Sequence, residues 1–141
     1  MVNEAAPLVE KENANQGPFL SFISSLVPRI HLAQLYALQG KYAAAATEIA
    51  ALEILAEKAP RTLPFHHTSY GIARVRARMG AAARALHWLQ LTVDTGWPQY
   101  PMMARDDMLD PIRNDPAVAK FLASLKKTWE NNEREFGNED Q

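Results

Sequence analysis

Two glycines, Gly40 and Gly80, each interrupt a run of helical periodicity, and they lie 40 positions apart in the sequence. Glycine readily takes the left-handed backbone conformation that ends many helices. Each glycine therefore predicts a turn between two helices. A spacing of this size is typical of stacked repeats, in which one helix-turn-helix unit packs against the next. The sequence thus predicts an all-α fold that contains two such units.

Apolar residues recur at helical intervals before and after both glycines. Pro28 suits the first turn of the first helix, where its missing N–H has no partner to lose. We expect Thr62 to cap the third helix, with Pro64 in its first turn. The expected helices span residues 28–39, 41–58, 63–79, 81–95 and 116–136.

The ends of the chain differ from its centre. Residues 1–17 are polar and without pattern, and we interpret them as a disordered or loosely docked arm. Residues 18–27 are apolar, and we expect a short helix or turn that covers an open end of the array. Residues 18–137 then form one helical domain, since 141 residues suffice for a single core, and residues 138–141 form a tail.

A connection rich in tryptophan, proline and tyrosine, residues 96–101, precedes the last helix. Asp110-Pro111 and Asp115-Pro116 each resemble a helix start, with an aspartate cap followed by proline in the first turn. The last helix carries its apolar residues at helical spacing: Val118, Phe121, Leu122, Leu125 and Trp129. We expect this helix to cap the array.

Composition and charge exclude several kinds of partner. A net charge of −1 supplies no field to hold a polyphosphate, so we expect no nucleic acid. The chain has no cysteine, which excludes disulfides and thiolate metal sites. Its N-terminus carries acids and amides where a signal peptide needs a basic start and an apolar core. The apolar run 19–26 is too short to span a bilayer. We therefore expect a cytoplasmic protein without membrane contact.

Few residues suggest chemistry. His66 and His67 are neighbours on a helix and point about 100° apart, which favours structural contacts over a shared metal ion. Trp88, Trp97 and Tyr100, like Trp129, are better explained as core and cap packing than as a binding platform. Capping also explains the acids before the last helix better than a calcium or magnesium site: Asp106, Asp107, Asp110 and Asp115. We expect no enzyme, no cofactor and no metal.

Several residues match the tetratricopeptide pattern when both glycines are aligned on it: Ala33, Tyr36, Gly40, Tyr42 and Ala45, then Ala73, Gly80 and Ala85. The segments TGWPQYP, LDPIRNDP and FLASLKKTWE are more specific. They resemble the last repeat and closing helix of tetratricopeptide arrays that end bacterial serine/threonine kinases and transcriptional regulators. The resemblance implies a short α-solenoid of two units plus a C-terminal capping helix. Arg76 departs from the pattern, which usually has an aromatic or apolar residue there.

The resemblance also implies that the first helix of each unit lines a concave groove. Partner-binding residues carried over from the pattern are Gln34, His67, Tyr70, Arg74 and Arg78. Arg74 and Arg78 share one helical face, where guanidinium groups could hold an acidic peptide through paired hydrogen bonds. The alternative is a solvated arginine face that pairs with the acidic N-terminal arm, Glu48 or Glu53.

We therefore expect a non-catalytic protein–protein interaction module that binds a peptide or partner domain, and an acidic partner would suit the arginine face. A second hypothesis is a homodimer, because a two-unit array leaves an apolar end that either residues 18–27 or a second chain must cover. A third is an accessory domain that senses a small ligand in a pocket near Trp97 and Tyr100.

Overall fold

The computed structural model of the chain describes residues 18–61 and 65–137, with side chains from Leu26 onward. These residues form seven helices and no strand, which confirms the expected all-α class. In chain order the helices are α2 (Pro18–Leu38), α3 (Tyr42–Glu57), α4 (Phe65–Arg78), α5 (Ala82–Asp94), α6 (Tyr100–Arg105), the 3-10 helix η1 (Asp107–Ile112) and α7 (Pro116–Phe136). The expected cap Thr62 and first-turn Pro64, the arm 1–17 and the tail 138–141 lie outside the described residues.

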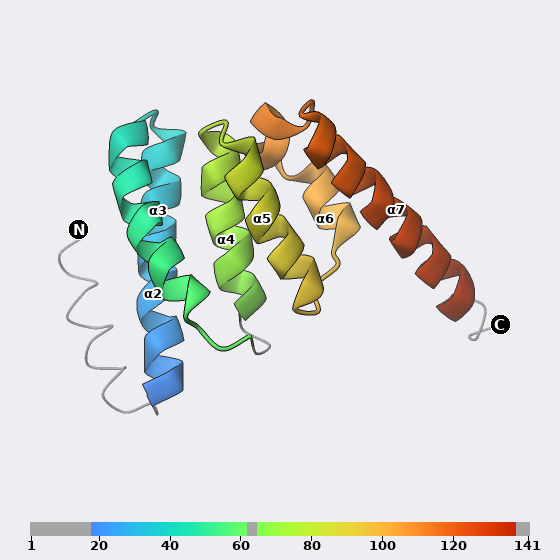
Figure 1. The fold of residues 1–141 in the computed structure, drawn as a ribbon, viewed down its shortest axis with the longest axis horizontal. Helices are drawn as coiled ribbons and strands as arrows, with labels where there is room; N and C mark the ends of the chain where they lie inside the picture. The colour runs from blue at the N-terminus through green and yellow to red at the C-terminus, as the bar shows by residue number, and fades with distance from the viewer. Residues whose placement is uncertain (1–17, 62–64, 138–141) are drawn as a thin grey trace.

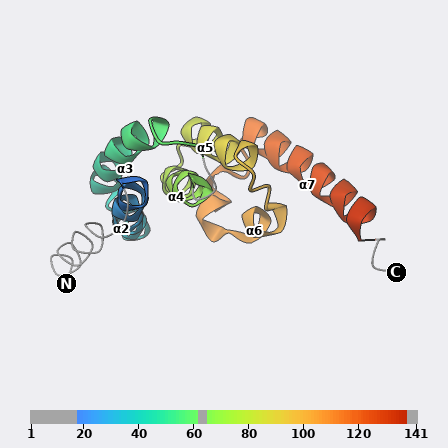
Figure 2. The same cartoon turned by 90° about the horizontal axis from the view of Figure 1, so that it is seen from below.

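The helices pack as two neighbouring hairpins, α2 with α3 and α4 with α5, followed by α6, η1 and α7 (Figure 1). Viewed from below, the helices follow an arc (Figure 2). Helices α2, α4 and α6 lie on its inner side, and α3, α5 and α7 lie on its outer side. Helix α4 occupies the centre, because it contacts α2, α3, α5 and η1.

Three glycines end helices with the same type of turn. Gly40, Gly80 and Gly96 have φ angles of 74°, 77° and 103°, which side chains rarely allow. In each turn the following amide donates to a carbonyl five residues back, as in a Schellman motif: Lys41 to Tyr36 at 2.8 Å, Ala81 to Arg76 at 2.9 Å and Trp97 to Thr92 at 3.1 Å. The two predicted helix-ending glycines are confirmed, and Gly96 is a third that the sequence reading placed only in a connection.

Helix α2 begins ten residues before its predicted start and runs through Pro28 without a break. The short helix or turn expected at residues 18–27 is helical, but it forms the first part of α2 and is not a separate element. Proline removes one backbone hydrogen bond, to the carbonyl four residues earlier on the same helical face. Pro28 itself is exposed.

The acidic helix starts are only partly as predicted. Asp115 caps α7 as expected, and its side chain accepts hydrogen bonds from the amides of Ala117 and Val118. Asp110 and Pro111 instead lie inside η1, so the predicted helix start at Asp110 is wrong. The cap of η1 is Asp106, whose side chain accepts a hydrogen bond from the amide of Met108. The 3-10 helix therefore begins before Asp110-Pro111, where the sequence predicted a helix start.

The core follows the apolar stripes of the helices, with small residues where helices approach closely. Ala33, Ala37 and Ala45 are fully buried between α2, α3 and their neighbours. An added Cβ at Gly71 of α4 would lie 2.6 Å from Cγ2 of Ile30, so α2 and α4 are closer here than alanine allows. Tyr42, one of the residues that match the repeat pattern, is exposed. The large fully buried side chains are Trp88, Phe65, Leu26, Ile49, Leu52, Ile72, Leu89, Met103, Leu109, Ile112, Val75 and Val118.

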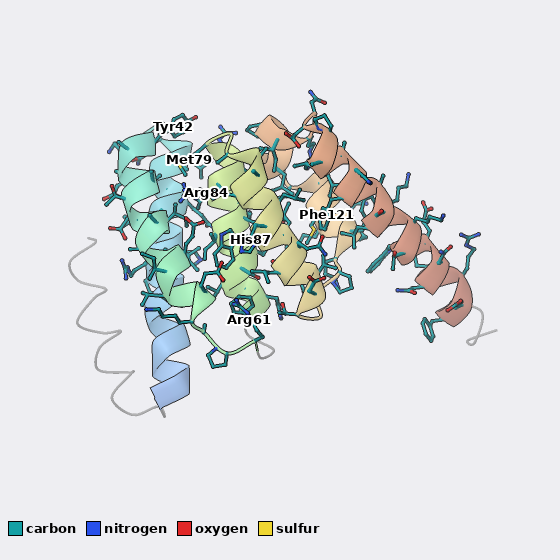
Figure 3. All side chains as sticks on the ribbon, viewed as in Figure 1. Tyr42, Arg61, Met79, Arg84, His87 and Phe121 are labelled. Atoms are coloured by element: carbon teal, nitrogen blue, oxygen red, sulfur yellow. The ribbon has the colours of Figure 1, made fainter. Side chains whose placement is uncertain are left out.

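A buried ionic cluster joins the two hairpins on the outer side of the arc. Arg76 of α4 donates to Glu53 of α3 through Nε at 3.1 Å and also through Nη2. The indole Nε1 of Trp88 on α5 donates to the other oxygen of Glu53 at 2.8 Å. Arg84 lies on the side of α5 nearest α3 and completes the cluster (Figure 3). Glu53 thus neutralises the arginine that replaces an apolar residue of the repeat pattern, and that replacement fits the core.

Within the described part of the chain, no helix has the length and apolar content needed to cross a membrane.

Candidate functional site: a groove between α2, α4 and α6

A groove with a volume of about 1160 Å³ opens between the inner helices. Figure 2 shows the order of these helices along the arc. Helix α2 forms one wall, α4 forms the floor, and α6 with its preceding connection forms the other wall. Its lining residues are Val27, Ile30, His31 and Gln34 from α2; His66, His67, Tyr70, Gly71 and Arg74 from α4; and Trp97, Gln99, Pro101, Met102, Arg105 and Asp106. The groove therefore uses all three inner helices.

The structure brings four of the five predicted partner-binding residues into this groove: Gln34, His67, Tyr70 and Arg74. Arg78 does not line it, because it lies one helical turn beyond Arg74, the last lining residue of α4. That the four residues bind a partner stays a prediction.

Asp106 is the centre of a hydrogen-bonded cluster between α4 and α6. The Tyr70 hydroxyl donates to Oδ2 of Asp106 at 2.6 Å, and Nε of Arg74 donates to the same oxygen at 2.7 Å. Oδ1 accepts from Nη2 of Arg74 at 3.4 Å and from the Met108 amide at 3.0 Å. These four hydrogen bonds satisfy a carboxylate whose side chain is only 9% exposed.

The environment of Tyr70 keeps its proton in place. Burial raises the pKa of the Tyr70 hydroxyl, and the hydrogen bond and negative charge of Asp106 raise this pKa further. Arg74 and Arg113 oppose the shift but do not reverse it. Tyr70 is therefore a neutral hydrogen-bond donor in the groove and is unsuited to act as a base or nucleophile.

Arg74 has a partner that the sequence interpretations did not name. Its guanidinium pairs with a carboxylate of its own chain, Asp106, and not with Glu48 or Glu53, while the acidic N-terminal arm lies outside the described residues. Glu48 is 3.6 Å from Arg29, and Glu53 belongs to the outer cluster. An external carboxylate would therefore compete with Asp106 for the Arg74 fork.

Sequence reasoning missed the contribution of α6, above all Arg105. This arginine lines the groove, is exposed, and forms no ion pair with any other residue in 18–61 or 65–137. Its helix is only six residues long, too short to show a hydrophobic period. The sequence signal for Arg105 is its position after the second helix-turn-helix unit, where a third helix of the array would be the next one on the inner side.

Histidines and one tryptophan line the rest of the groove. His31, His66 and His67 are three of the four histidines in the chain, and they enter the groove from two helices. The His66 ring stacks on Trp97, with centroids 5.4 Å apart and an angle of 8° between the planes. Across the described ranges, no group of three His, Cys, Asp or Glu residues is placed to hold a metal ion. These residues offer aromatic surface on which a ligand can stack.

Comparison of the chain with protein-family models, with curated proteins and with solved structures gave no match.

Proposed function

We propose that the protein is a non-catalytic interaction module of the tetratricopeptide kind, and that its groove binds an acidic peptide segment of a partner protein. The observation that carries this proposal is the charge of the groove. Its single lining carboxylate, Asp106, is paired with Arg74, which leaves the exposed guanidinium of Arg105 as an excess positive charge among the described lining residues. A concave site with excess positive charge attracts and orients negative segments.

The architecture supports a tetratricopeptide assignment. The two hairpins turn at left-handed glycines 40 residues apart, and the first helix of each hairpin lies on the inner side of the arc. Stacked helical repeats use such inner surfaces to bind extended or helical peptides. The apolar lining adds contact area for side chains that flank the acidic residues.

A direct test measures fluorescence polarisation with two fluorescein-labelled octapeptide pools. One pool has Glu or Asp at alternate positions, and the other has Lys at the same positions. We expect the acidic pool to bind at least about tenfold more tightly, a difference of about 1.4 kcal/mol. Equal binding of the two pools, or binding of neither, would refute the proposed function.

The groove itself is tested with Met102→Glu and a matched control, Ile54→Glu. Both positions are exposed, at 45% and 61%, but only Met102 lines the groove. We expect Met102→Glu to repel the acidic pool and Ile54→Glu to bind it as the wild type does. Equal effects of the two substitutions would place the binding surface elsewhere.

Self-association is a second candidate function, favoured by apolar side chains at the end of the first hairpin. Leu35, Leu38 and Tyr42 are all exposed there, and Tyr42 lies at the tip of the hairpin turn (Figure 3). If this end pairs with another copy, light scattering should show a dimer that Leu38→Lys converts to a monomer. A monomeric wild type at high concentration would remove this candidate.

A further inference from the structure

The groove contains two arginines, and their charges are not equally available. Arg74 is held by Asp106 through its Nε at 2.7 Å and its Nη2 at 3.4 Å, and its side chain is 32% exposed. Arg105 is exposed, lines the same groove, and has no ion-pair partner among the residues that the structure describes. A ligand carboxylate near Arg74 would meet the negative charge of Asp106. Arg105, in contrast, forms no salt bridge with a described carboxylate, so a ligand carboxylate would not have to displace one from its guanidinium.

The backbone that carries Arg105 is fixed immediately after it. Asp106, the next residue, is held by Tyr70 and Arg74 of α4 through its side chain. The Asp106 carbonyl accepts from Nη2 of Arg113 at 2.8 Å, and the same Nη2 donates to the Met103 carbonyl at 3.0 Å. The junction of α6 and η1 is thus tied both to the groove floor and to its own helix turn.

The position of Arg113 makes it a suitable probe of this junction. Its Nε donates to Asp110 of η1 at 2.8 Å while its Nη2 joins two carbonyls across the junction. Arg113 is not among the residues that line the groove. The forked guanidinium makes these bonds together, whereas a lysine ammonium carries the same charge without that geometry.

We propose that Arg105 is the specificity-determining residue of the groove, which selects a ligand carboxylate, and that Asp106 and Arg113 are positioning residues that hold it. This inference rests on the proposed function and names its ligand more closely. Val27, Ile30 and Met102 supply apolar surface in the same groove. The ligand is therefore an acidic peptide in which the selected carboxylate lies next to an apolar side chain.

The test uses two fluorescein-labelled hexapeptide pools that share a central leucine followed by either Glu or the isosteric Gln. Fluorescence polarisation gives the ratio of the two dissociation constants for each variant of the full chain. For the wild type we expect a preference of about tenfold for the Glu pool, the size of one charge-assisted hydrogen bond. Arg105→Gln should bind both pools equally, at the wild-type affinity for the Gln pool.

The matched control is Arg78→Gln, which removes the same charge from an arginine outside the groove and should keep the tenfold ratio. A preserved Glu preference in Arg105→Gln would overturn the role of Arg105 and leave the proposed function standing. Wild-type chain that binds neither pool would instead refute the proposed function itself.

The positioning role is tested with Arg113→Lys, which preserves net charge. We expect the Glu-over-Gln ratio to fall to about threefold while the affinity for the Gln pool stays unchanged, because only the aim of Arg105 is lost. A purely structural role would weaken both pools together. Either that result or an unchanged ratio would overturn the positioning role, and circular dichroism establishes that the variant is folded.

Discussion

The outer and inner sides of the arc each contain a carboxylate that accepts from an arginine of α4 and from an aromatic donor. On the outer side Glu53 binds Arg76 and the indole of Trp88. On the inner side Asp106 binds Arg74 and the hydroxyl of Tyr70. Residues two apart on a helix point about 200° apart, so α4 sends one arginine to each side.

The two clusters differ in the exposure of their arginines. The Arg76 side chain is 8% exposed, and that of Arg74 is 32% exposed. A guanidinium that water cannot reach depends on its carboxylate, whereas one at a groove can be hydrated when the carboxylate is lost. The same kind of cluster can therefore hold two hairpins together where its arginine is buried, and can line a groove where its arginine is partly exposed.

The largest effect is expected for Glu53→Ala. This change leaves the buried charge of Arg76 unpaired and removes the acceptor of the Trp88 indole. We expect the free energy of unfolding in urea to fall by about 3–5 kcal/mol, the range for one partner lost from a buried ion pair. A loss below about 1 kcal/mol would show that Arg76 reaches water in the absence of Glu53.

A smaller loss is expected for Asp106→Asn. The amide keeps the size of the side chain but weakens the bonds to Tyr70 and Arg74, and Arg74 is exposed enough to be hydrated. Urea unfolding should show a loss of about 1–3 kcal/mol, the range for a hydrogen bond to a charged group. If Asp106→Asn costs as much as Glu53→Ala, exposure does not separate the two clusters.

The hairpins and part of the groove could be predicted from the sequence because their causes are local. Left-handed turns at Gly40 and Gly80 follow from residue type, and they are confirmed by φ angles of 74° and 77°. The groove location of Gln34, His67 and Tyr70 was carried over from the repeat pattern, since the inner helices keep their register relative to those glycines.

The remaining features depend on contacts between distant residues. Arg76 is neutralised by Glu53, 23 positions away, and Arg74 by Asp106, 32 positions away. No periodicity signals either pairing. The groove location of Arg105 was missed because its helix is too short to show a hydrophobic period. The continuation of α2 through Pro28 was missed because proline is more typical of the first turn of a helix.

Alkaline pH should distinguish the clusters, because tyrosine ionises and tryptophan does not. The folded protein raises the pKa of Tyr70, chiefly by burial and then through Asp106. The unfolded chain therefore releases this proton first, from about pH 10 upward, and unfolding becomes more favourable as pH rises. The stabilisation is complete below that pH. Above it we expect a loss of up to about 1.4 kcal/mol per pH unit in urea unfolding.

In Tyr70→Phe this alkaline contribution should disappear, although the variant starts from a lower stability at neutral pH. Tyr42→Phe is the matched control, because it removes a tyrosine that is exposed and outside both clusters. The same alkaline slope in Tyr70→Phe and the wild type would mean that another group causes the loss.

The smallest effect is expected near the Glu53 cluster, where Nε2 of His87 on α5 lies 2.8 Å from Oε1 of Glu57 on α3. This pair joins α3 to α5, as the hydrogen bond between Trp88 and Glu53 does, but its side chains are 52% and 48% exposed. Because water already solvates both groups, Glu57→Ala should cost about 0–1 kcal/mol in urea unfolding. The change removes a glutamate as Glu53→Ala does, four positions away on the same helix. A cost near that of Glu53→Ala would mean that a bridge between α3 and α5 stabilises the protein whether or not its side chains are exposed. A cost near zero would attribute the difference to the burial of Arg76.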